Sequence, residues 1–329
     1  MKRVRAARVA VVALSWVLLS VVTAMSAETA PLRHKTAAVN GVELHYVEAG
    51  QGPLILFLHG FPEFWYAWKD SLAEFGKDHH AVAVDMRGYN LSSKPERVED
   101  YRMPHLVGDV AALIGHLEAE KAVLVGHDWG GAVAWAFALA HPEMLERLVI
   151  INAPHPAVFA REIAGNPEQQ QASGYMNLFR SPEAEAVLSK DNYAWLRQIF
   201  ASQAFSDEDR QAYLAAWSQP GALTGGLNYY RANIRQQIPA GQSGSQTAPP
   251  GEADELPAFI PPATELPLVE VATLVVWGEQ DRALLTGNLD GLEKHVREIE
   301  IRRIPDGSHW VVHEQPQQVH RLIREFLEP

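Results

Sequence analysis

Short, fully apolar runs recur along the chain, and each is followed by polar or glycine-rich residues. They cover residues 54–58, 81–84, 122–125, 148–151 and 274–277. Runs of this length without polar positions are typical of strands buried on both faces, as in a parallel sheet. In addition, Val39-Asn40-Gly41-Val42 predicts a tight hairpin between two short strands, because Asn-Gly accepts positive φ at both central positions.

Helical spacing occupies the intervals between these runs, with apolar residues every three or four positions over 106–117, 133–139 and 317–327. Alternating strands and helices predict an α/β fold with a doubly wound, mostly parallel sheet. From 155 to 267 the chain shows helical segments and no strand candidates. We therefore expect a core domain of residues 28–154 and 268–329 with a helical lid, 155–267, inserted in the chain. Residues 239–262 contain six prolines and three glycines, which predicts a mobile loop within the lid.

The first 27 residues have the pattern of a secretory signal. Four basic residues precede an uncharged apolar run over 9–24, and small residues follow it. The pattern predicts cleavage and export to the periplasm or the medium, with no stable membrane insertion afterwards. The alternative is a membrane anchor through residues 9–24, although this run is short for a spanning helix.

Composition narrows the classes of function. The chain of 329 residues has no cysteine, so a disulfide scaffold, a thiol nucleophile and thiolate metal sites are excluded. Its formal net charge is −12, which argues against binding to nucleic acid. Nothing in the sequence calls for a metal or a cofactor, and a homo-oligomer is compatible with it.

The strongest chemical signal is Gly126-His127-Asp128-Trp129-Gly130-Gly131, between a predicted buried strand and a predicted helix. This is the pattern of a nucleophile elbow, in which a sharp turn lifts one side chain above the sheet. The residue at the tip is Asp128. A carboxylate is a poor nucleophile for acyl transfer, but it displaces a leaving group at saturated carbon and forms an alkyl ester. The simpler interpretation is that Asp128 caps the following helix.

Three further segments complete this hypothesis. His59-Gly60-Phe61-Pro62 follows a predicted strand, and in α/β-hydrolase folds such a loop supplies one oxyanion-hole amide. The expected donors are the backbone N–H groups of Phe61 and Trp129. Late in the chain, His309 is the expected base that activates water, and Asp281 is the acid expected to orient it. Glu279, two residues earlier, is the alternative acid.

Taken together, these segments resemble the α/β-hydrolase-fold epoxide hydrolases of the soluble type. The resemblance covers nearly the whole chain after residue 27. Its motifs are HGFPE from 59 to 63, DMRGY from 85 to 89, the elbow from 126 to 131, LNYYR from 227 to 231 and GSHW from 307 to 310. It implies the conversion of an organic epoxide and water to a vicinal diol. Family members carry two lid tyrosines that protonate the epoxide oxygen, and they correspond here to Tyr175 and Tyr230.

Two questions stay open at this level. Haloalkane and haloacid dehalogenases use the same Asp nucleophile and the same ester. They stabilise a halide with side-chain N–H donors, whereas an alkoxide needs an acid. The size of the substrate is also open, although the aromatic side chains of the lid predict an apolar pocket. These are Trp195, Phe200, Phe205 and Trp217.

Overall fold

The computed structural model describes residues 31–201, 205–234, 238 and 266–328. The predictions of a signal over 1–27 and of a loop over 239–262 lie outside these ranges. Within them, eight strands form one sheet in the order β1-β2-β4-β3-β5-β6-β7-β8. The strands are β1 (Arg33–Val39), β2 (Val42–Ala49), β3 (Leu54–Leu58), β4 (His80–Val84), β5 (Ala122–His127), β6 (Leu145–Ile151), β7 (Thr273–Gly278) and β8 (Ile299–Ile304).

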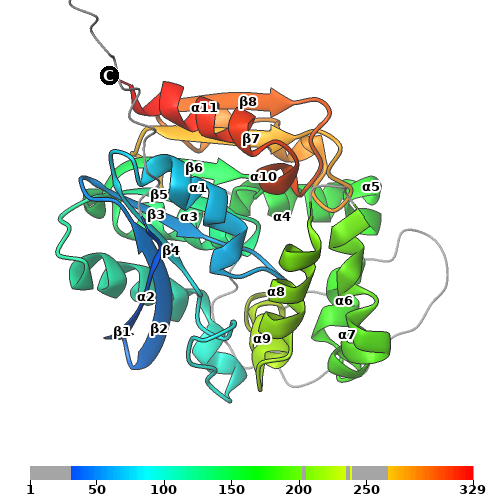
Figure 1. The fold of residues 1–329 in the computed structure, drawn as a ribbon. Coiled ribbons are helices and arrows are strands. Elements are labelled where there is room, and N and C mark those ends of the chain that lie inside the picture. The colour runs from blue at the N-terminus through cyan, green and yellow to red at the C-terminus, as the bar shows by residue number, and fades with distance from the viewer. Residues whose placement is uncertain (1–30, 202–204, 235–237, 239–265, 329) are drawn as a thin grey trace, which may run out of the picture.

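Helices connect the strands and cover the sheet. They are α1 (Lys69–Phe75), α2 (Met103–His116), α3 (Trp129–Ala140), α4 (Pro156–Gly165), α5 (Pro167–Ala172), α6 (Tyr175–Arg180), α7 (Ala184–Tyr193), α8 (Asp207–Trp217), α9 (Ala222–Asn233), α10 (Val311–Glu314) and α11 (Pro316–Leu327). Helices α2 and α3 pack together on one face of the sheet, and α1 and α11 pack together on the other. The fold is therefore the α/β architecture that the sequence predicts (Figure 1).

The sheet follows the predicted pattern closely. Strands β1 and β2 form the expected hairpin, with Val39 opposite Val42 and positive φ at Asn40 and Gly41. The pairs β1/β2 and β2/β4 are antiparallel, and every other neighbouring pair is parallel. All residues of β3 and β5 are buried, as expected for central strands covered on both faces.

Strand β8 is the element that the apolar runs did not predict. It lies at the edge of the sheet, and its Arg302 and Arg303 are exposed. An edge strand has a partner on one side only, so its sequence lacks the continuous apolar run that identifies a central strand. The described residues between 155 and 267 contain helices and no strand, as predicted. Helices α6 to α9 stand together beyond one end of the sheet (Figure 1).

Across the described ranges, no helix has both the length and the apolar character needed to cross a membrane. The apolar run over residues 9–24 lies outside these ranges.

Candidate active site

Asp128 occupies the turn between β5 and α3, which is the centre of the site. Its backbone has φ 51° and ψ −120°, a conformation that is costly for a residue other than glycine. Glycines make the turn sterically feasible, since a Cβ at Gly126 would lie only 2.7 Å from Cα of Gly131. The strain and the close packing together present the carboxylate at the carboxyl end of a central strand. They form the nucleophile elbow that the sequence predicts.

The contacts of Asp128 are those of a carboxylate that points away from helix α3, and not those of a residue that caps the helix. Its side chain makes no capping hydrogen bond to α3. Instead, the backbone N–H of Phe61, in the loop after β3, donates to Oδ1 of Asp128 over 2.8 Å. Trp129 is the first residue of α3, and the first amides of a helix have no partner within that helix. The two amides expected in the oxyanion hole thus flank Asp128.

His309 lies between two carboxylates. Its Nδ1 is 2.7 Å from Oδ2 of Asp281, and its Nε2 is 3.7 Å from Oδ2 of Asp128. Asp281 is held by the amides of Ala283 and Leu284 and by the side chain of Asn152, which donates over 2.8 Å. The structure therefore brings the predicted nucleophile, base and acid together in one line.

The other acid considered from the sequence faces away. Glu279 forms an ion pair with Arg303 on β8. Asn152 was missed by sequence reasoning, although it follows β6 directly and so sits at the same end of the sheet as Asp128. A polar residue just after a buried strand is the signal that points to it.

The flanking carboxylates determine the charge of the imidazole. Burial alone would lower the pKa of His309, but the charges of Asp281 and Asp128 and the hydrogen bond to Asp281 raise it to about 9. Burial alone would raise the pKa of Asp281, and the charge and hydrogen bond of His309 lower it instead. In the resting site His309 is therefore an imidazolium at neutral pH, paired with an ionised Asp281.

Both predicted tyrosines lie close to Asp128. Tyr230 is on α9 and Tyr175 is at the start of α6, and the centres of their rings are 6.4 Å apart. Burial raises the pKa of each phenol well above its usual value of 10, and the negative charge of Asp128 raises it further. Both side chains therefore keep their protons at neutral pH. Phenols that remain protonated beside a carboxylate are available as acids for an oxygen near that carboxylate.

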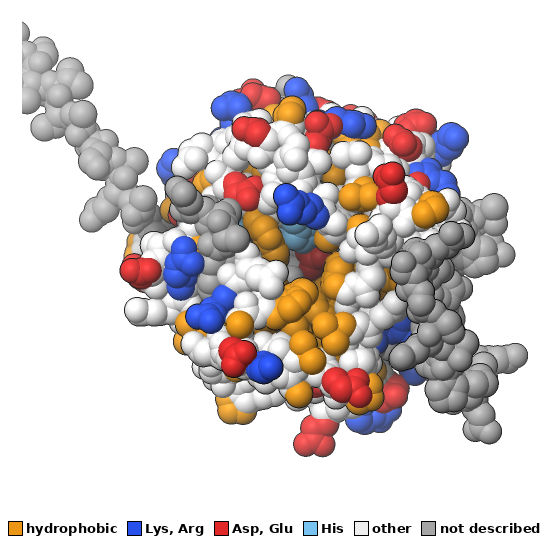
Figure 2. Space-filling view, turned by 90° about the vertical axis from the view of Figure 1, so that its right-hand side faces the viewer, with side chains coloured by type: hydrophobic (Ala, Val, Ile, Leu, Met, Phe, Trp, Pro, Cys, Tyr) orange, Lys and Arg blue, Asp and Glu red, His pale blue; other side chains and the backbone are white. Residues whose placement is uncertain are grey.

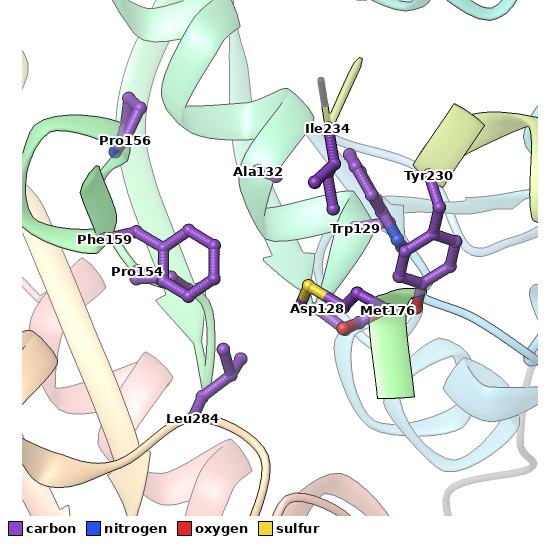
Figure 3. A pocket seen from close by; sticks show the side chains of 10 residues that line it. All are labelled: Asp128, Trp129, Ala132, Pro154, Pro156, Phe159, Met176, Tyr230, Ile234 and Leu284. Carbon is purple, nitrogen blue, oxygen red and sulfur yellow. The ribbon is translucent and has the colours of Figure 1, made fainter. Parts of the chain in front are cut away.

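Asp128 and Tyr230 line one apolar pocket, whose empty space, including the part open to solvent, is about 530 Å³ (Figure 3). Besides Asp128, Trp129 and Tyr230, the lining consists of Ala132, Pro154, Pro156, Phe159, Met176, Ile234 and Leu284. Figure 2 shows a hollow on one face of the molecule, with a histidine and an acidic side chain at its bottom and hydrophobic side chains along its rim. The apolar lining suits a small apolar organic ligand.

The pocket is apolar, as predicted, but its lining does not come from the aromatic residues proposed for it. Trp217 donates its indole N–H to the carbonyl oxygen of Pro62, and Phe205 packs against Tyr213 and His313. These side chains anchor the helical segment to the core instead of facing the ligand. The side chain of Phe200 lies outside the described residues.

A buried network beside the site was also missed from the sequence. Glu63 is fully buried and contacts His127, His313 and the hydroxyl of Tyr213 on α8. The Nε2 of His127 in turn lies 2.8 Å from the backbone oxygen of His309. His127 and His313 thus neighbour the site, and His127 links the His309 loop to the elbow. His155 stacks on His295.

No metal site accompanies these groups in the described part of the chain: no cluster there has three or more His, Asp or Glu side chains arranged to hold an ion.

Comparison with known proteins gives a consistent result. Residues 53–316 match the family described as alpha/beta hydrolase fold. The Bacillus subtilis AB hydrolase superfamily protein YfhM is 38% identical over 296 residues, which cover 88% of this chain and 95% of that protein. Epoxide hydrolase 4 of Mus musculus is 35% identical over 301 residues, covering 88% of this chain and 77% of the relative.

Solved structures agree. A Bacillus megaterium epoxide hydrolase in complex with an inhibitor superimposes with a TM-score of 0.78 at 36% sequence identity, covering 89% of this chain and 99% of the other. The match spans both the sheet and its helices. The chain belongs to the α/β-hydrolase fold family, and within that family it groups with the epoxide hydrolases.

Proposed function

We propose that the protein hydrolyses organic epoxides to vicinal diols through an alkyl ester on Asp128. One observation supports this above the others. The Asp128 carboxylate shares an apolar pocket with the protonated phenol of Tyr230, while His309 stands 3.7 Å away on its other side. A nucleophile, an acid and a base are thus available to one small substrate.

In the first step, a carboxylate oxygen of Asp128 attacks a ring carbon and the carbon–oxygen bond of the epoxide breaks. The electron pair goes to the epoxide oxygen, which takes a proton from Tyr175 or Tyr230. An alkoxide is strongly basic, so a proton donor at this position lowers the barrier. The products are a neutral ester on Asp128 and a tyrosinate. The negative charge that was on the Asp128 carboxylate is now on the tyrosinate.

In the second step, His309 removes a proton from water, and the oxygen of that water adds to the ester carbonyl. The amides of Phe61 and Trp129 stabilise the tetrahedral oxyanion. The proton on His309 goes to the departing alkoxide, and the proton left on the Asp128 carboxyl returns to the tyrosinate. Esterification also removes the charge of Asp128, which is one of the charges that raise the pKa of His309. The pKa of His309 therefore falls when the ester forms, and the imidazolium releases its proton to solvent before it accepts one from the attacking water. When hydrolysis restores the Asp128 carboxylate, the imidazole takes up a proton from solvent again.

The dehalogenase alternative is not favoured. It requires side-chain N–H donors toward the pocket, but Phe61 offers none. The two buried, protonated phenols suit an alkoxide leaving group, whereas a halide needs no proton. The apolar lining supports an apolar organic epoxide as the substrate.

The covalent intermediate provides the test. His309→Gln should form the ester but fail to hydrolyse it, because only the second step needs the base. Mass spectrometry after incubation with styrene oxide should show the peptide containing Asp128 heavier by one whole epoxide. Asp128→Asn in the same background is the matched control and should remain unmodified. An unmodified Asp128 peptide in His309→Gln, together with diol formation, would indicate direct attack by water.

We also propose that residues 155–267 form a lid over the core and that residues 1–27 direct export. The lid is supported by the positions of Met176 on α6 and Tyr230 on α9, since both side chains line the pocket. Export is supported by the basic start and the apolar run of the sequence. N-terminal sequencing of protein from separated cell fractions tests it, and cytosolic protein that retains Met1 or Lys2 would contradict it.

A further inference from the structure

We propose that the indole N–H of Trp129 positions the hydroxyl of Tyr230 for ring opening, so that the residue after the nucleophile serves both half-reactions. Its backbone amide acts in ester hydrolysis, and its side chain acts in ester formation. The inference rests on the proposed function and assigns a positioning role within that site.

The geometry of the two side chains carries the proposal. Trp129 and Tyr230 line the same pocket, on α3 and α9 respectively, and both are almost fully buried. Their ring centres are 5.0 Å apart and the planes meet at 85°. Figure 3 shows the indole nitrogen directed toward Tyr230. A contact of this kind joins the core to the helical segment directly beside Asp128.

A hydrogen bond between these two side chains can run in one direction only. An indole N–H only donates, so the oxygen of Tyr230 accepts from Trp129 and keeps its own proton for donation. Burial and the charge of Asp128 raise the pKa of Tyr230, and the hydrogen bond from Trp129 lowers it. Tyr175 also forms a hydrogen bond with Tyr230, which lowers the pKa of Tyr175. In this arrangement the indole of Trp129 donates to Tyr230, and Tyr230 donates to Tyr175.

This chain matters when the epoxide opens. The proton of a phenol moves to the epoxide oxygen, and the phenolate that remains is stabilised by the N–H that already points at it. A donor set in place beforehand needs no reorganisation during the reaction, which makes it effective in a dry pocket. In a dehalogenase, the indole N–H of Trp129 would have to bind the departing halide. Donation to Tyr230 occupies that N–H.

The test separates the two half-reactions. Trp129→Phe keeps a ring and the backbone amide but removes the N–H. In the His309→Gln background, where hydrolysis is blocked, the rate of ester accumulation reports ring opening alone. We expect Trp129→Phe to slow it about tenfold, the scale of one lost hydrogen bond to a charged group. With His309 restored, the hydrolysis rate of the ester should change less than about twofold, because the amide is retained.

Trp135→Phe is the matched control. Trp135 is also buried on α3, but its N–H donates to the carbonyl oxygen of Ala153. Losing that bond should not slow ester formation selectively. If Trp129→Phe does not fold, 3-benzothienylalanine at position 129 replaces the N–H by sulfur in a ring of the same shape, and it is measured in the same way.

A double-variant comparison completes the test. Combined with Tyr230→Phe, the loss of the indole N–H should cause little further slowing, since its partner is already gone. An equal slowing with and without the Tyr230 hydroxyl, or an equal effect on both half-reactions, would overturn the positioning role. The absence of any ester in His309→Gln with Trp129 intact would instead overturn the proposed function. The two failures are therefore distinguishable.

Discussion

The stability of the protein should fall between pH 6.5 and 9 because of a single imidazole. His309 has a folded-state pKa of about 9, against 6.5 for an unperturbed histidine. A group whose pKa is higher in the folded state stabilises the fold when it is protonated. This contribution is fully present below pH 6.5 and is lost as the pH rises through 9. Replacing His309 by Gln removes the titration.

The magnitude follows from the two pKa values. One pKa unit corresponds to 1.36 kcal/mol, so the interval from 6.5 to about 9 corresponds to about 3 kcal/mol. No large discount for solvent screening applies, since the His309 side chain is only 13% exposed and Asp281 is buried. We therefore expect the unfolding free energy of the wild type relative to His309→Gln to decrease by about 3 kcal/mol over this interval.

Urea unfolding of both proteins at a series of pH values between about 6 and 10 measures this difference. His155→Gln is the control. Its pKa in the folded protein is lowered by burial and by the neighbouring His295, to about 3. His155 is therefore neutral above pH 7.5 in the folded and the unfolded states alike, and its variant should run parallel to the wild type there. A difference between wild type and His309→Gln that stays constant within about 0.5 kcal/mol would refute the paired imidazolium.

Three further predictions concern individual side chains. Tyr175→Phe and Tyr230→Phe should each slow ester formation and together nearly abolish it, and full epoxide turnover in both single variants would contradict the acid role. Gly60→Ala should prevent ester formation, because a Cβ there would lie 2.7 Å from Cγ of Asp128. Gly115→Ala, an exposed site in α2 with open space around it, is the control and should retain turnover. Glu63→Gln should lower the unfolding free energy by about 3 kcal/mol, because it removes the charge at the centre of a buried network. A urea titration measures this loss, and a value below about 1 kcal/mol would show that the network is dispensable.

Local patterns were sufficient for much of the fold and the site. The central strands are covered on both faces, so their sequences are continuous apolar runs that can be recognised without a structure. The elbow at Asp128 and the positions of Asp281 and His309 follow from motifs whose spacing reflects the geometry of single turns. These features depend on neighbours in sequence, and sequence alone predicts them.

Other features arise only from packing between distant segments. Glu63 meets His313 across 250 positions of the chain, and Trp217 turns to Pro62 instead of the pocket. The lining by Phe159 and Ile234 and the contact of Trp129 with Tyr230 depend on how the helical segment rests on the sheet. No periodicity encodes such contacts, because each side chain has several sterically allowed directions and the surrounding tertiary structure selects one of them.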